Sequence, residues 1–470
     1  MESALKIGMK QDALNILLRQ RRFDLIFKYL YAKRPSAYHR SAYLEHIRAF
    51  NGFFELNPSD GKPKNSADDF LNSYDVLIRS LRTNGYDASL DAIPLGTNGE
   101  IQDGAHRLSA CAALGIPADI EPDQSGMLDD VYDYRYFRRK GMDESVMDYG
   151  ALAYVRLNPN AYIVNLHSVT DPQYDAQVES ILNSYGVVFY QKDVCLTYTG
   201  LVNLKKISYG SFWERGNWIG APENHYFGAQ DHAQASLGKH PTRVFVFVCD
   251  DLAKVVKAKE QIRAIYNIGN FSIHINDTHD EAVCLAETYF NANSLFCLNN
   301  RPFDREDEAF DSNVDYLKNQ ALQLGVSLDD VCAVGSTPLN QFLLRRSNDL
   351  DYLSLDERMN IEDDIISPHD EQLKNYPYSK EELITNPAYY SFYHGFKIIS
   401  LDVAYRFKQR RRERPKDLRD CRLIRRLWCR SHFDVLLFRY NAIHHPLCGP
   451  VIAYAQKNKR RVQRVLKKLG

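Results

Sequence analysis

A short segment, Asp103-Gly104-Ala105-His106-Arg107, combines groups that bind phosphate. Gly104 stands between an expected short strand and an expected helix, where a residue without a side chain lets backbone amides approach a ligand. The helix that follows would offer unpaired N–H groups, and Arg107 has the donor geometry for a pair of phosphate oxygens. His106 adds a donor, and Asp103 can hold a metal ion or accept a proton. The alternative interpretation is an ordinary tight turn with exposed polar side chains.

A second pattern joins a glycine-serine turn to a pair of carboxylates. Gly335-Ser336 ends the small apolar run 331–334, and Asp349 and Asp351 follow on either side of a leucine. Side chains two apart on a strand face the same way, so these aspartates would present paired carboxylates to one or two Mg²⁺ ions on nucleotide phosphates. The turn, at a helix start, would meet the phosphates themselves. An acidic loop beside a buried strand is the alternative.

The middle of the chain concentrates ionisable groups at the end of an expected strand. Ligands bind at strand ends in α/β sheets, so Asp277 and His279 are candidates for ligating a metal or exchanging a proton with substrate, with His274 on the strand itself. His167 ends another expected strand and would point into the same crevice. The alternative is that Asp277 or Thr278 simply caps the following helix.

These residues depend on elements that the hydrophobic pattern predicts. Residues 10–50 and 66–84 have helical periodicity, and Ser66 is the expected N-cap of the second helix. A helix of small residues follows over 108–114. From about residue 151, strands and helices alternate, which is typical of an α/β or α+β fold. The expected strands are 162–166, 187–190, 244–249, 271–275 and 295–298, and the expected helices include 252–266 and 280–290.

The segment IQDGAHRLSACAALGI, residues 101–116, resembles the D-G-x-H-R-x-x-A motif of the ParB/sulfiredoxin superfamily. The resemblance extends upstream through the 66–84 helix to Phe53. Members of this superfamily bind CTP or ATP, or use ATP or ADP to phosphorylate a small substrate. The resemblance therefore implies nucleotide binding, together with either a nucleotide-dependent DNA clamp or phosphoryl transfer to a free amino acid or a sulfinic acid.

The same resemblance implies roles for individual residues. Gly104, His106 and Arg107 would hold phosphates, and Asp103 would support Mg²⁺ or polarise the acceptor. Glu55 stands where the free-serine kinases of the superfamily carry a carboxylate that acts as general base. Because the phosphate loop has no cysteine, sulfinic-acid reduction is not expected, and no evident helix-turn-helix follows the motif to support DNA clamping.

Gly335-Ser336 followed by Asp349-Leu350-Asp351 is similar to the signature of the DNA polymerase β superfamily of nucleotidyltransferases. That resemblance implies a bound nucleotide, with Mg²⁺ on the two aspartates. Arg345 and Arg346 would either contact phosphate or form a solvated face. Such a site needs a third carboxylate, for which the candidates are Asp402, Asp417 and Asp420.

The composition is that of a globular protein. The chain of 470 residues has 44% hydrophobic and 25% charged residues and a net charge of −1, which excludes a wholly disordered, collagen-like or coiled-coil chain. No apolar run is long enough to span a bilayer, and the first residues lack a signal-peptide core, so we expect a cytoplasmic protein. The nine cysteines show no zinc-binding spacing, which favours reduced, buried thiols.

The carboxyl-terminal end is basic. Residues 401–470 contain 20 Lys and Arg against 5 Asp and Glu, so the rest of the chain is acidic. Its last expected helix, with Val462, Val465 and Leu469 on one face and basic residues around them, is typical of a segment that lies on anionic lipid. Alternatively, this helix packs on the protein with a solvated basic side. Nucleic-acid binding is not favoured, because no aromatic residues are interleaved with the charge.

We therefore predict a multidomain α/β (α+β) enzyme that uses ATP, or another nucleotide, and Mg²⁺. The expected function is ATP-dependent phosphorylation of a small hydroxyl compound or sugar in bacterial capsule or lipopolysaccharide assembly, at the inner face of the membrane. Nucleotidyl transfer at Asp349 and Asp351, or a non-catalytic nucleotide-dependent scaffold, are the alternatives.

The expected units are a nucleotide-binding kinase domain over 1–125, a linker over 126–150, an α/β domain over 151–310 and a nucleotidyltransferase-like region over 311–470. The residues expected to act are, for catalysis, Glu55, Asp103 and His106 and, for nucleotide binding, Gly104, Ala105, Arg107, Gly335 and Ser336.

Overall fold

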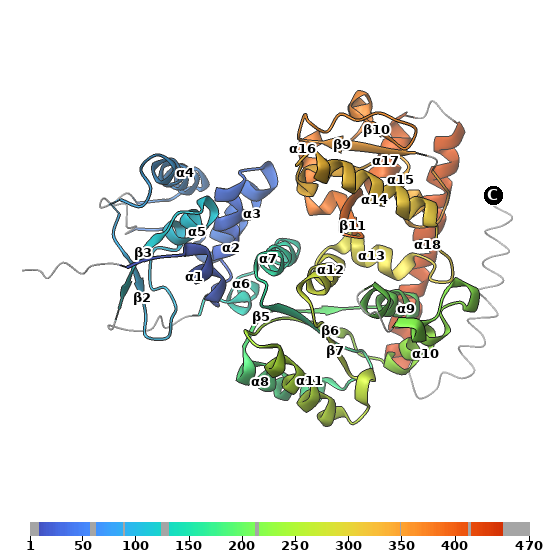
Figure 1. Cartoon of the computed structure of the whole chain (residues 1–470), viewed down its shortest axis with the longest axis horizontal. Helices are drawn as coiled ribbons and strands as arrows, with labels where there is room; N and C mark the ends of the chain where they lie inside the picture. Colours follow the sequence, from blue (N-terminus) through green and yellow to red (C-terminus); the bar gives the residue numbers. More distant parts are fainter. Residues whose placement is uncertain are drawn as a thin grey trace, which may run out of the picture.

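The protein is a mixed α/β chain, as predicted, and its described residues form three sheets. Figure 1 shows the amino-terminal elements, coloured blue, at one end of the molecule, and the second and third sheets one below the other at the opposite end. No helix in the described part of the chain is long and apolar enough to cross a membrane. The computed structural model describes residues 9–56, 63–87, 90–123, 131–211, 216–347, 349–411 and 415–444.

The amino-terminal region combines a small sheet with five helices. The sheet has the order β1-β3-β2, and its central strand is antiparallel to β1 and parallel to β2. The elements are β1 Met9–Gln11, α1 Ala13–Arg19, α2 Leu25–Lys33, α3 Ala37–Asn51, α4 Ala67–Asn84, β2 Ile93–Leu95, α5 Ala105–Leu114 and β3 Ala118–Pro122.

The stretch 10–50, expected to be helical, is divided into a strand and three helices. Asp12 caps α1 and Ser36 caps α3, each by accepting from backbone amides of the first turn. Pro35 lies between α2 and α3, where a proline disfavours helical geometry in the residue before it. The apolar spacing thus predicts helix correctly, and the caps and the proline decide where each helix begins.

Helices α4 and α5 follow the prediction closely. Ser66 caps α4 by accepting from the Asp69 amide, as expected. Helix α5 lies between Gly104, with a φ of 78°, and Gly115, with a φ of 69°. A residue with a side chain is strained at these angles, so the two glycines fix the limits of α5.

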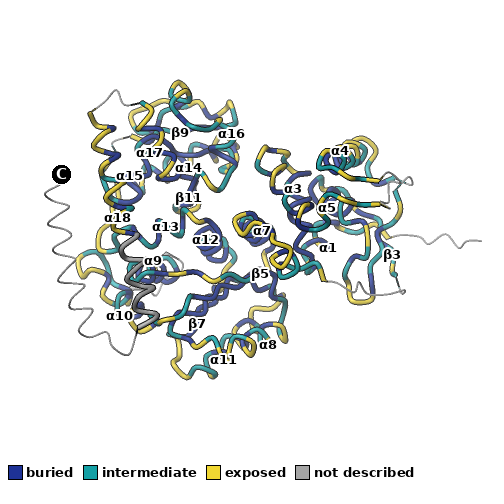
Figure 2. Tube along the Cα trace, turned by 180° about the vertical axis from the view of Figure 1, so that it is seen from behind, coloured by how far each residue is buried: buried dark blue, intermediate teal, exposed yellow. Residues whose placement is uncertain are grey.

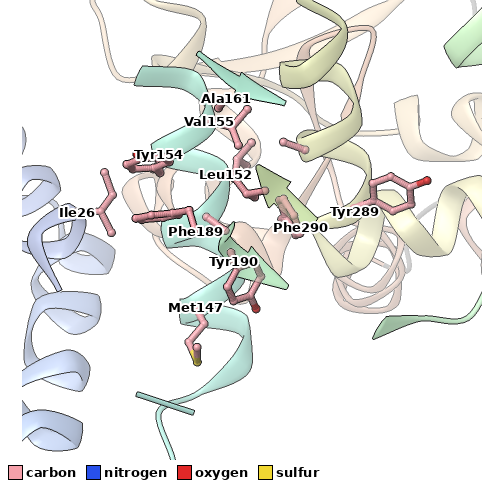
Figure 3. Packing of buried hydrophobic residues seen from close by; sticks show 14 of the residues in the cluster. Ile26, Met147, Leu152, Tyr154, Val155, Ala161, Phe189, Tyr190, Tyr289 and Phe290 are labelled. Atoms are coloured by element: carbon pink, nitrogen blue, oxygen red, sulfur yellow. The ribbon is translucent and has the colours of Figure 1, made fainter. Parts of the chain in front are cut away.

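The segment expected to link the first two domains is helical where it is described, with α6 at Tyr134–Arg139 and α7 at Glu144–Leu157. Helix α7 packs against α2 on one side and α12 (His279–Tyr289) on the other. The rings of Tyr154 on α7 and Phe189 stack with centroids 3.5 Å apart (Figure 3). Within residues 131–150, Phe137 and Met147 are fully buried, so α6 and the start of α7 contribute to the apolar core.

The middle region has an antiparallel sheet of order β5-β6-β4-β7. Its βαββαβ sequence with this strand order is that of a ferredoxin-like unit, and the crossover helices α8 and α11 pack against each other (Figure 1). Helices α9 and α10 are inserted between β5 and β6. The bounds are β4 Ala161–Leu166, α8 Asp175–Tyr185, β5 Val187–Val194, α9 Tyr198–Lys206, α10 Phe227–Ser236, β6 Thr242–Val248, α11 Leu252–Tyr266, β7 Ile273–Ile275 and α13 Ala292–Asn300.

One predicted strand of this region is wrong. Residues 295–298 lie inside α13, which Asn291 caps by accepting from the Ser294 amide. A short apolar run fits a buried strand and a buried helix equally well, and here the asparagine cap was the deciding signal. The other four predicted strands correspond to β4, β5, β6 and β7.

The third region has a mixed sheet of order β10-β9-β8-β12-β11. Strand β8 is antiparallel to β9 and parallel to β12, and β9 is parallel to β10. The basic end is helical through α17 and α18, whereas residues 456–470 lie outside the described part. The bounds are α14 Glu308–Gln323, β8 Val331–Ala333, α15 Thr337–Gln341, β9 Leu350–Ser354, β10 Ile366–Pro368, α16 Lys380–Thr385, β11 Tyr390–Tyr393, β12 Phe396–Ile399, α17 Leu401–Arg411 and α18 Pro415–His444.

The three regions pack together through apolar and charged contacts. One buried apolar cluster runs through the first and second regions into the third, and a smaller one lies within the third sheet. Figure 2 shows α12 and β7 as largely buried stretches. Arg34 pairs with Asp330 across the first and third regions, and Arg156 on α7 pairs with Glu287 on α12. The three sheets are thus held as one body.

Candidate functional site

The Gly335-Ser336 turn and Asp351 meet at the end of β8. Strand β9 returns antiparallel to β8, and the Val334 amide donates to the Asp351 carbonyl at 2.7 Å. Gly335 has a φ of 63°, and the Asp351 carboxylate lies so close to it that a Cβ at this position would collide with the carboxylate. We call this cluster, with Asp349, the carboxyl-terminal site.

The two carboxylates of this site differ in exposure. Asp349 is exposed, whereas the side chain of Asp351 is 27% exposed and lies 3.8 Å from His369 Nε2. The Tyr376 hydroxyl accepts from the Gly335 amide at 3.2 Å and lies 3.0 Å from His369 Nδ1. Burial raises the pKa of Asp351; His369 opposes this shift and the charge of Asp349 adds to it. A cation bound at Asp351 would offset both its burial and the repulsion from Asp349.

Two cations hold the serine of the turn. Ser336 Oγ accepts from Arg345 Nη2 at 2.8 Å and from Lys408 Nζ at 3.3 Å. Asp420 on α18 fixes both cations, with Oδ1 2.9 Å from Arg345 Nε and Oδ2 2.8 Å from Lys408 Nζ. The side chains of Lys408 and Asp420 are fully buried. This network therefore keeps two positive charges next to the turn.

Each candidate for a third carboxylate is bound to a cation. Asp417 pairs with Arg411 at 2.7 Å, Asp420 binds the two cations just described, and Asp402 pairs with Arg406 at 2.8 Å. Across the described ranges, no group of three or more His, Cys, Asp or Glu side chains is arranged to hold a metal ion. A metal at this site would rest on Asp349 and Asp351, with water or substrate oxygens as further ligands.

Sequence reasoning missed four residues of this site: His369, Tyr376, Lys408 and Arg411. The two cations lie in a run that was interpreted as basic charge alone. A signal was present in the spacing, because Lys408 and Arg411, and likewise Asp417 and Asp420, stand three residues apart and each pair shares a helix face. Complementary pairs on consecutive helices indicate two helices that face each other.

The amino-terminal segment that was expected to bind phosphate forms the start of α5. Ala105 is its first helical residue, Gly104 precedes it in the left-handed region, and the side chain of Asp103 is 64% exposed. Arg107 is buried, donates to the Asp91 carbonyl, and lies with its Nη2 3.2 Å from Asp103 Oδ2. Its guanidinium thus ties the chain before β2 to the helix start, which reduces the donor capacity it has for a phosphate.

His106 and Glu55 lie around a buried tyrosine cluster. His106 Nε2 is 3.0 Å from the Tyr43 hydroxyl, and its ring packs edge-on against Tyr74. Burial lowers the pKa of His106 well below its ordinary value, and nearby cationic side chains, including Lys64, lower it further. Glu55 lies 3.4 Å from Lys64. The structure therefore brings Glu55 and a neutral His106 near the same lysine.

The candidates of the middle segment do not form one site. His274 is buried, with Nε2 2.6 Å from Glu281 Oε1 and Nδ1 3.1 Å from the Tyr209 hydroxyl. Asp277 lies 3.6 Å from a lysine of α11. Thr278 caps α12 by accepting from the Glu281 amide, which is the alternative that the sequence left open. His279 lines a different space, a cavity between the second and third regions.

His167 joins His274 in a buried cluster of nitrogen bases. Its Nε2 lies 2.7 Å from Lys205 Nζ, and both side chains are fully buried. Burial lowers the pKa of Lys205 to about 7. Burial also lowers the pKa of the neighbouring His232 to about 3. Lys205 was missed from sequence, because a single lysine in an amphipathic helix carries no signal of burial.

The described residues thus bring Gly335, Ser336 and Asp351 together, with the exposed Asp349 two residues away along the chain, and keep Asp103 to Arg107 as one helix start. Glu281 binds both His274 and the Asp277 amide, whereas His279 lines a separate cavity. In comparisons with known proteins, no family model, no curated protein and no solved structure matches this chain.

Proposed function

We propose that the protein transfers a nucleotidyl group at the carboxyl-terminal site in a Mg²⁺-dependent reaction. One observation carries the proposal: the Asp351 carboxylate lies directly against Gly335, beside a serine hydroxyl that accepts from two fixed cations. Oxygen ligands suited to Mg²⁺ and donors suited to phosphate therefore stand side by side. The exposed position of Asp349 leaves this side of the site open to a ligand.

Mg²⁺ fits the donor set of this site. Asp349 and Asp351 offer hard carboxylate oxygens, and the raised pKa of Asp351 reflects burial and a repulsion from Asp349 that a bound cation would remove. When bound, the ion supplies charge neutralisation on the phosphates. Arg345, which is partly exposed, would orient the phosphate chain by charge-assisted hydrogen bonds, and the buried Lys408 would support the turn through Ser336.

The reaction joins an acceptor hydroxyl to a nucleoside triphosphate. A bond forms between the acceptor oxygen and the α-phosphorus as the bond from that phosphorus to the bridging oxygen of the β-phosphate breaks. Pyrophosphate leaves with that electron pair, and the acceptor proton is released. Such a transfer depends on positioning and charge neutralisation, which the fixed cations and the paired carboxylates provide.

The test is product analysis with the full-length protein, Mg²⁺ and nucleoside triphosphates labelled at the α-phosphate, with sugars and the protein itself as acceptors. We expect labelled acceptor and one pyrophosphate for each transfer. Asp351→Asn should lower the rate at least 100-fold, whereas Asp304→Asn, an exposed aspartate after α13, should leave it unchanged. Full turnover by a correctly folded Asp351→Asn protein would sink the proposal.

A second candidate function is ATP-dependent phosphorylation of a small hydroxyl compound or sugar by the amino-terminal region. It is supported by the proximity of Glu55 and His106 to Lys64, beside a glycine turn that begins α5. Glu55 would act as general base, and Asp103 would support Mg²⁺ or polarise the acceptor. This reaction releases ADP rather than pyrophosphate, so Asp103→Ala should abolish ADP formation and leave any pyrophosphate formation intact.

A non-catalytic, nucleotide-dependent scaffold would release neither product. A role in capsule or lipopolysaccharide assembly at a membrane surface would require the basic end to bind anionic lipid. Residues 456–470 lie outside the described part, so vesicle flotation of the full chain and of a chain ending at residue 455 tests this. Equal flotation of the two chains would remove the membrane role.

A further inference from the structure

A cavity of about 1040 Å³ separates the second region from the third. It is distinct in position from the carboxyl-terminal site, since neither Asp349 nor Asp351 lines it. One face of α12, including Asp280, Cys284 and Glu287, forms one wall, at helical spacings of four and three residues. Helix α13, the start of α14 and the turn between β11 and β12 form the others. A space of this size can enclose a ligand as large as a sugar phosphate or a disaccharide.

Most charges in the cavity wall neutralise each other. Lys206 lies 2.9 Å from Glu306, and Arg156 lies 2.6 Å from Glu287. Lys318 lies 3.7 Å from Asp315, so Arg301, which directly follows α13, is the exception among the described cations of the wall. Its Nη1 donates to a backbone carbonyl at 2.6 Å, and no described carboxylate lies within ion-pair distance of it. Arg301 is half-buried, so a ligand anion is the group that would complete its hydrogen bonds.

The aromatic side chains of the wall are already covered by cations. Lys206 lies 3.7 Å from the ring centre of Tyr226, Arg156 lies 4.8 Å from that of Phe392, and Arg301 lies 5.0 Å from that of Tyr393. These contacts hold the rings and the cations in place. A planar aromatic ligand would have to displace these cations from the rings, so the cavity favours a ligand without an aromatic ring.

Uncharged hydrogen-bonding groups complete the wall. His279 Nδ1 is buried and has no partner among the described residues. Asn203 turns its amide nitrogen to two carbonyls, at 2.9 Å each, which leaves its oxygen as an acceptor. A mixture of donors and acceptors around an electrically balanced wall matches the hydroxyl groups of a polyol, which donate and accept alike.

We infer that this cavity binds a small polyol with one anionic group, such as a sugar phosphate or a sugar acid, with the anion on Arg301. This inference does not depend on the proposed nucleotidyl transfer, because no residue of the carboxyl-terminal site takes part in it. Phosphate and carboxylate would both satisfy the guanidinium, and the experiment distinguishes the two.

The experiment measures binding to the full-length protein by calorimetry, without nucleotide or Mg²⁺. Glucose 6-phosphate, glucuronate, glucose and inorganic phosphate are the probes. We expect one of the two anionic sugars to bind at least ten times more tightly than glucose and than inorganic phosphate, since both the anion and the hydroxyls contribute. Equal affinity for inorganic phosphate, or no binding by either anionic sugar, would overturn the inference.

Two variants locate the site. Arg301→Gln should weaken binding of the anionic sugar about tenfold or more, whereas Arg305→Gln, an exposed arginine in the loop that follows, should not change it. Val283→Trp fills the cavity from α12 without removing a charge and should abolish binding. Unchanged binding by the Val283→Trp protein would place the ligand elsewhere and refute the assignment, even if Arg301→Gln failed to fold.

Discussion

Lys205 and His167 form a fully buried pair of nitrogen bases, with Nζ 2.7 Å from Nε2. His167 Nδ1 has no partner among the described residues, and burial lowers the pKa of Lys205 from 10.5 to about 7. The His274 and His232 rings stand in the same cluster around Tyr209. This cluster remains outside both proposed reactions and makes the stability of the middle region depend on pH.

Replacing Lys205 with Met should stabilise the protein at pH 7 by a few kcal/mol. The unfolded chain binds the lysine proton up to about pH 10.5 and the folded chain only up to about pH 7. Between these values the unfolded state holds more protons, so this lysine makes the unfolding free energy rise with pH and destabilises the fold most at or below pH 7. The variant lacks this contribution, so its advantage should shrink as the pH approaches 10.

Denaturant unfolding at pH 7, 8.5 and 10 gives the free energy of unfolding of the parent and of Lys205→Met. The difference between the two values measures this effect, because the titration of tyrosines and cysteines is common to both proteins and cancels. Lys257→Met, an exposed lysine on α11, is the matched control and should show no such trend. A Lys205→Met protein that is less stable than the parent at pH 7 would show that the ammonium has a favourable partner.

The sequence predicts the local elements of this fold better than their assembly. The helix limits follow from single residues: Ser66 and Thr278 cap their helices, and two glycines with positive φ bound α5. These limits can be predicted from sequence because capping and positive φ are local requirements. The division of residues 10–50 into separate helices, and the placement of residues 295–298 in α13, depend on which apolar residues find partners. Those partners lie far away in sequence, so periodicity alone does not reveal them.

The carboxyl-terminal site shows the same limit. The approach of Gly335 to Asp351 follows from the antiparallel pairing of β8 with β9, which are joined by residues 334–349 with α15 among them. The motif spacing places the glycine turn and the aspartates near strands but does not predict this pairing. The burial of Lys408 on Asp420 does not follow, because it requires α17 and α18 to pack on the turn. The charge run 408–414 predicts solvent exposure by composition, and a run of like charge gives no sign that one member is buried.

Gly335→Ala should destabilise the protein by about 2–4 kcal/mol, from a strained φ and from a clash with Asp351. Gly325→Ala is the matched control. Its φ of 66° imposes the same backbone strain, but its Cβ would meet only an arginine side chain at 3.5 Å. Chemical denaturation should therefore show a clearly larger loss for Gly335→Ala.

A second substitution separates the two causes. Shortening Asp351 to Ala in the Gly335→Ala background should restore the part of the loss that the clash contributes, so the two changes should be non-additive. Strict additivity would mean that the carboxylate moves away freely and that its contact with the glycine is not constrained. That result would also weaken the argument for a fixed metal ligand.

Arg107→Lys should lower the free energy of unfolding, whereas Asp103→Ala should leave it nearly unchanged. Arg107 is buried and joins the Asp91 carbonyl to Asp103, so a lysine, which lacks the planar fork, should cost about 1–3 kcal/mol and speed amide exchange over residues 90–104. Asp103 is 64% exposed, and its loss should change the unfolding free energy by less than about 0.5 kcal/mol. An equally large effect of Asp103→Ala would assign it a structural role and remove it from any phosphate chemistry.

Arg156→Met should destabilise the packing of α7 against α12 and the third region by about 3–5 kcal/mol at neutral pH. Arg156 lies 2.6 Å from Glu287, whose side chain is 6% exposed and whose pKa burial raises even with the arginine present. The second partner of Arg156, Asp329, lies 3.1 Å away and keeps Lys397 at 3.5 Å when the arginine is removed. Without its partner, the buried carboxylate is stable only when protonated. A raised folded pKa gives stability that is present at low pH and lost as the pH rises, so the deficit should be smallest near pH 4 and grow toward pH 7.

Arg156→Met with Glu287→Leu removes both charges and should recover most of the loss, because two apolar groups then fill the space of the pair. Arg139→Met, an exposed arginine at the end of α6, is the control and should be neutral. Thermal unfolding across pH 4 to 7 for the four proteins measures these differences. If the double variant is as unstable as Arg156→Met, the cost arises from lost packing on Phe392 rather than from an unpaired charge, and the pH dependence should then be absent as well.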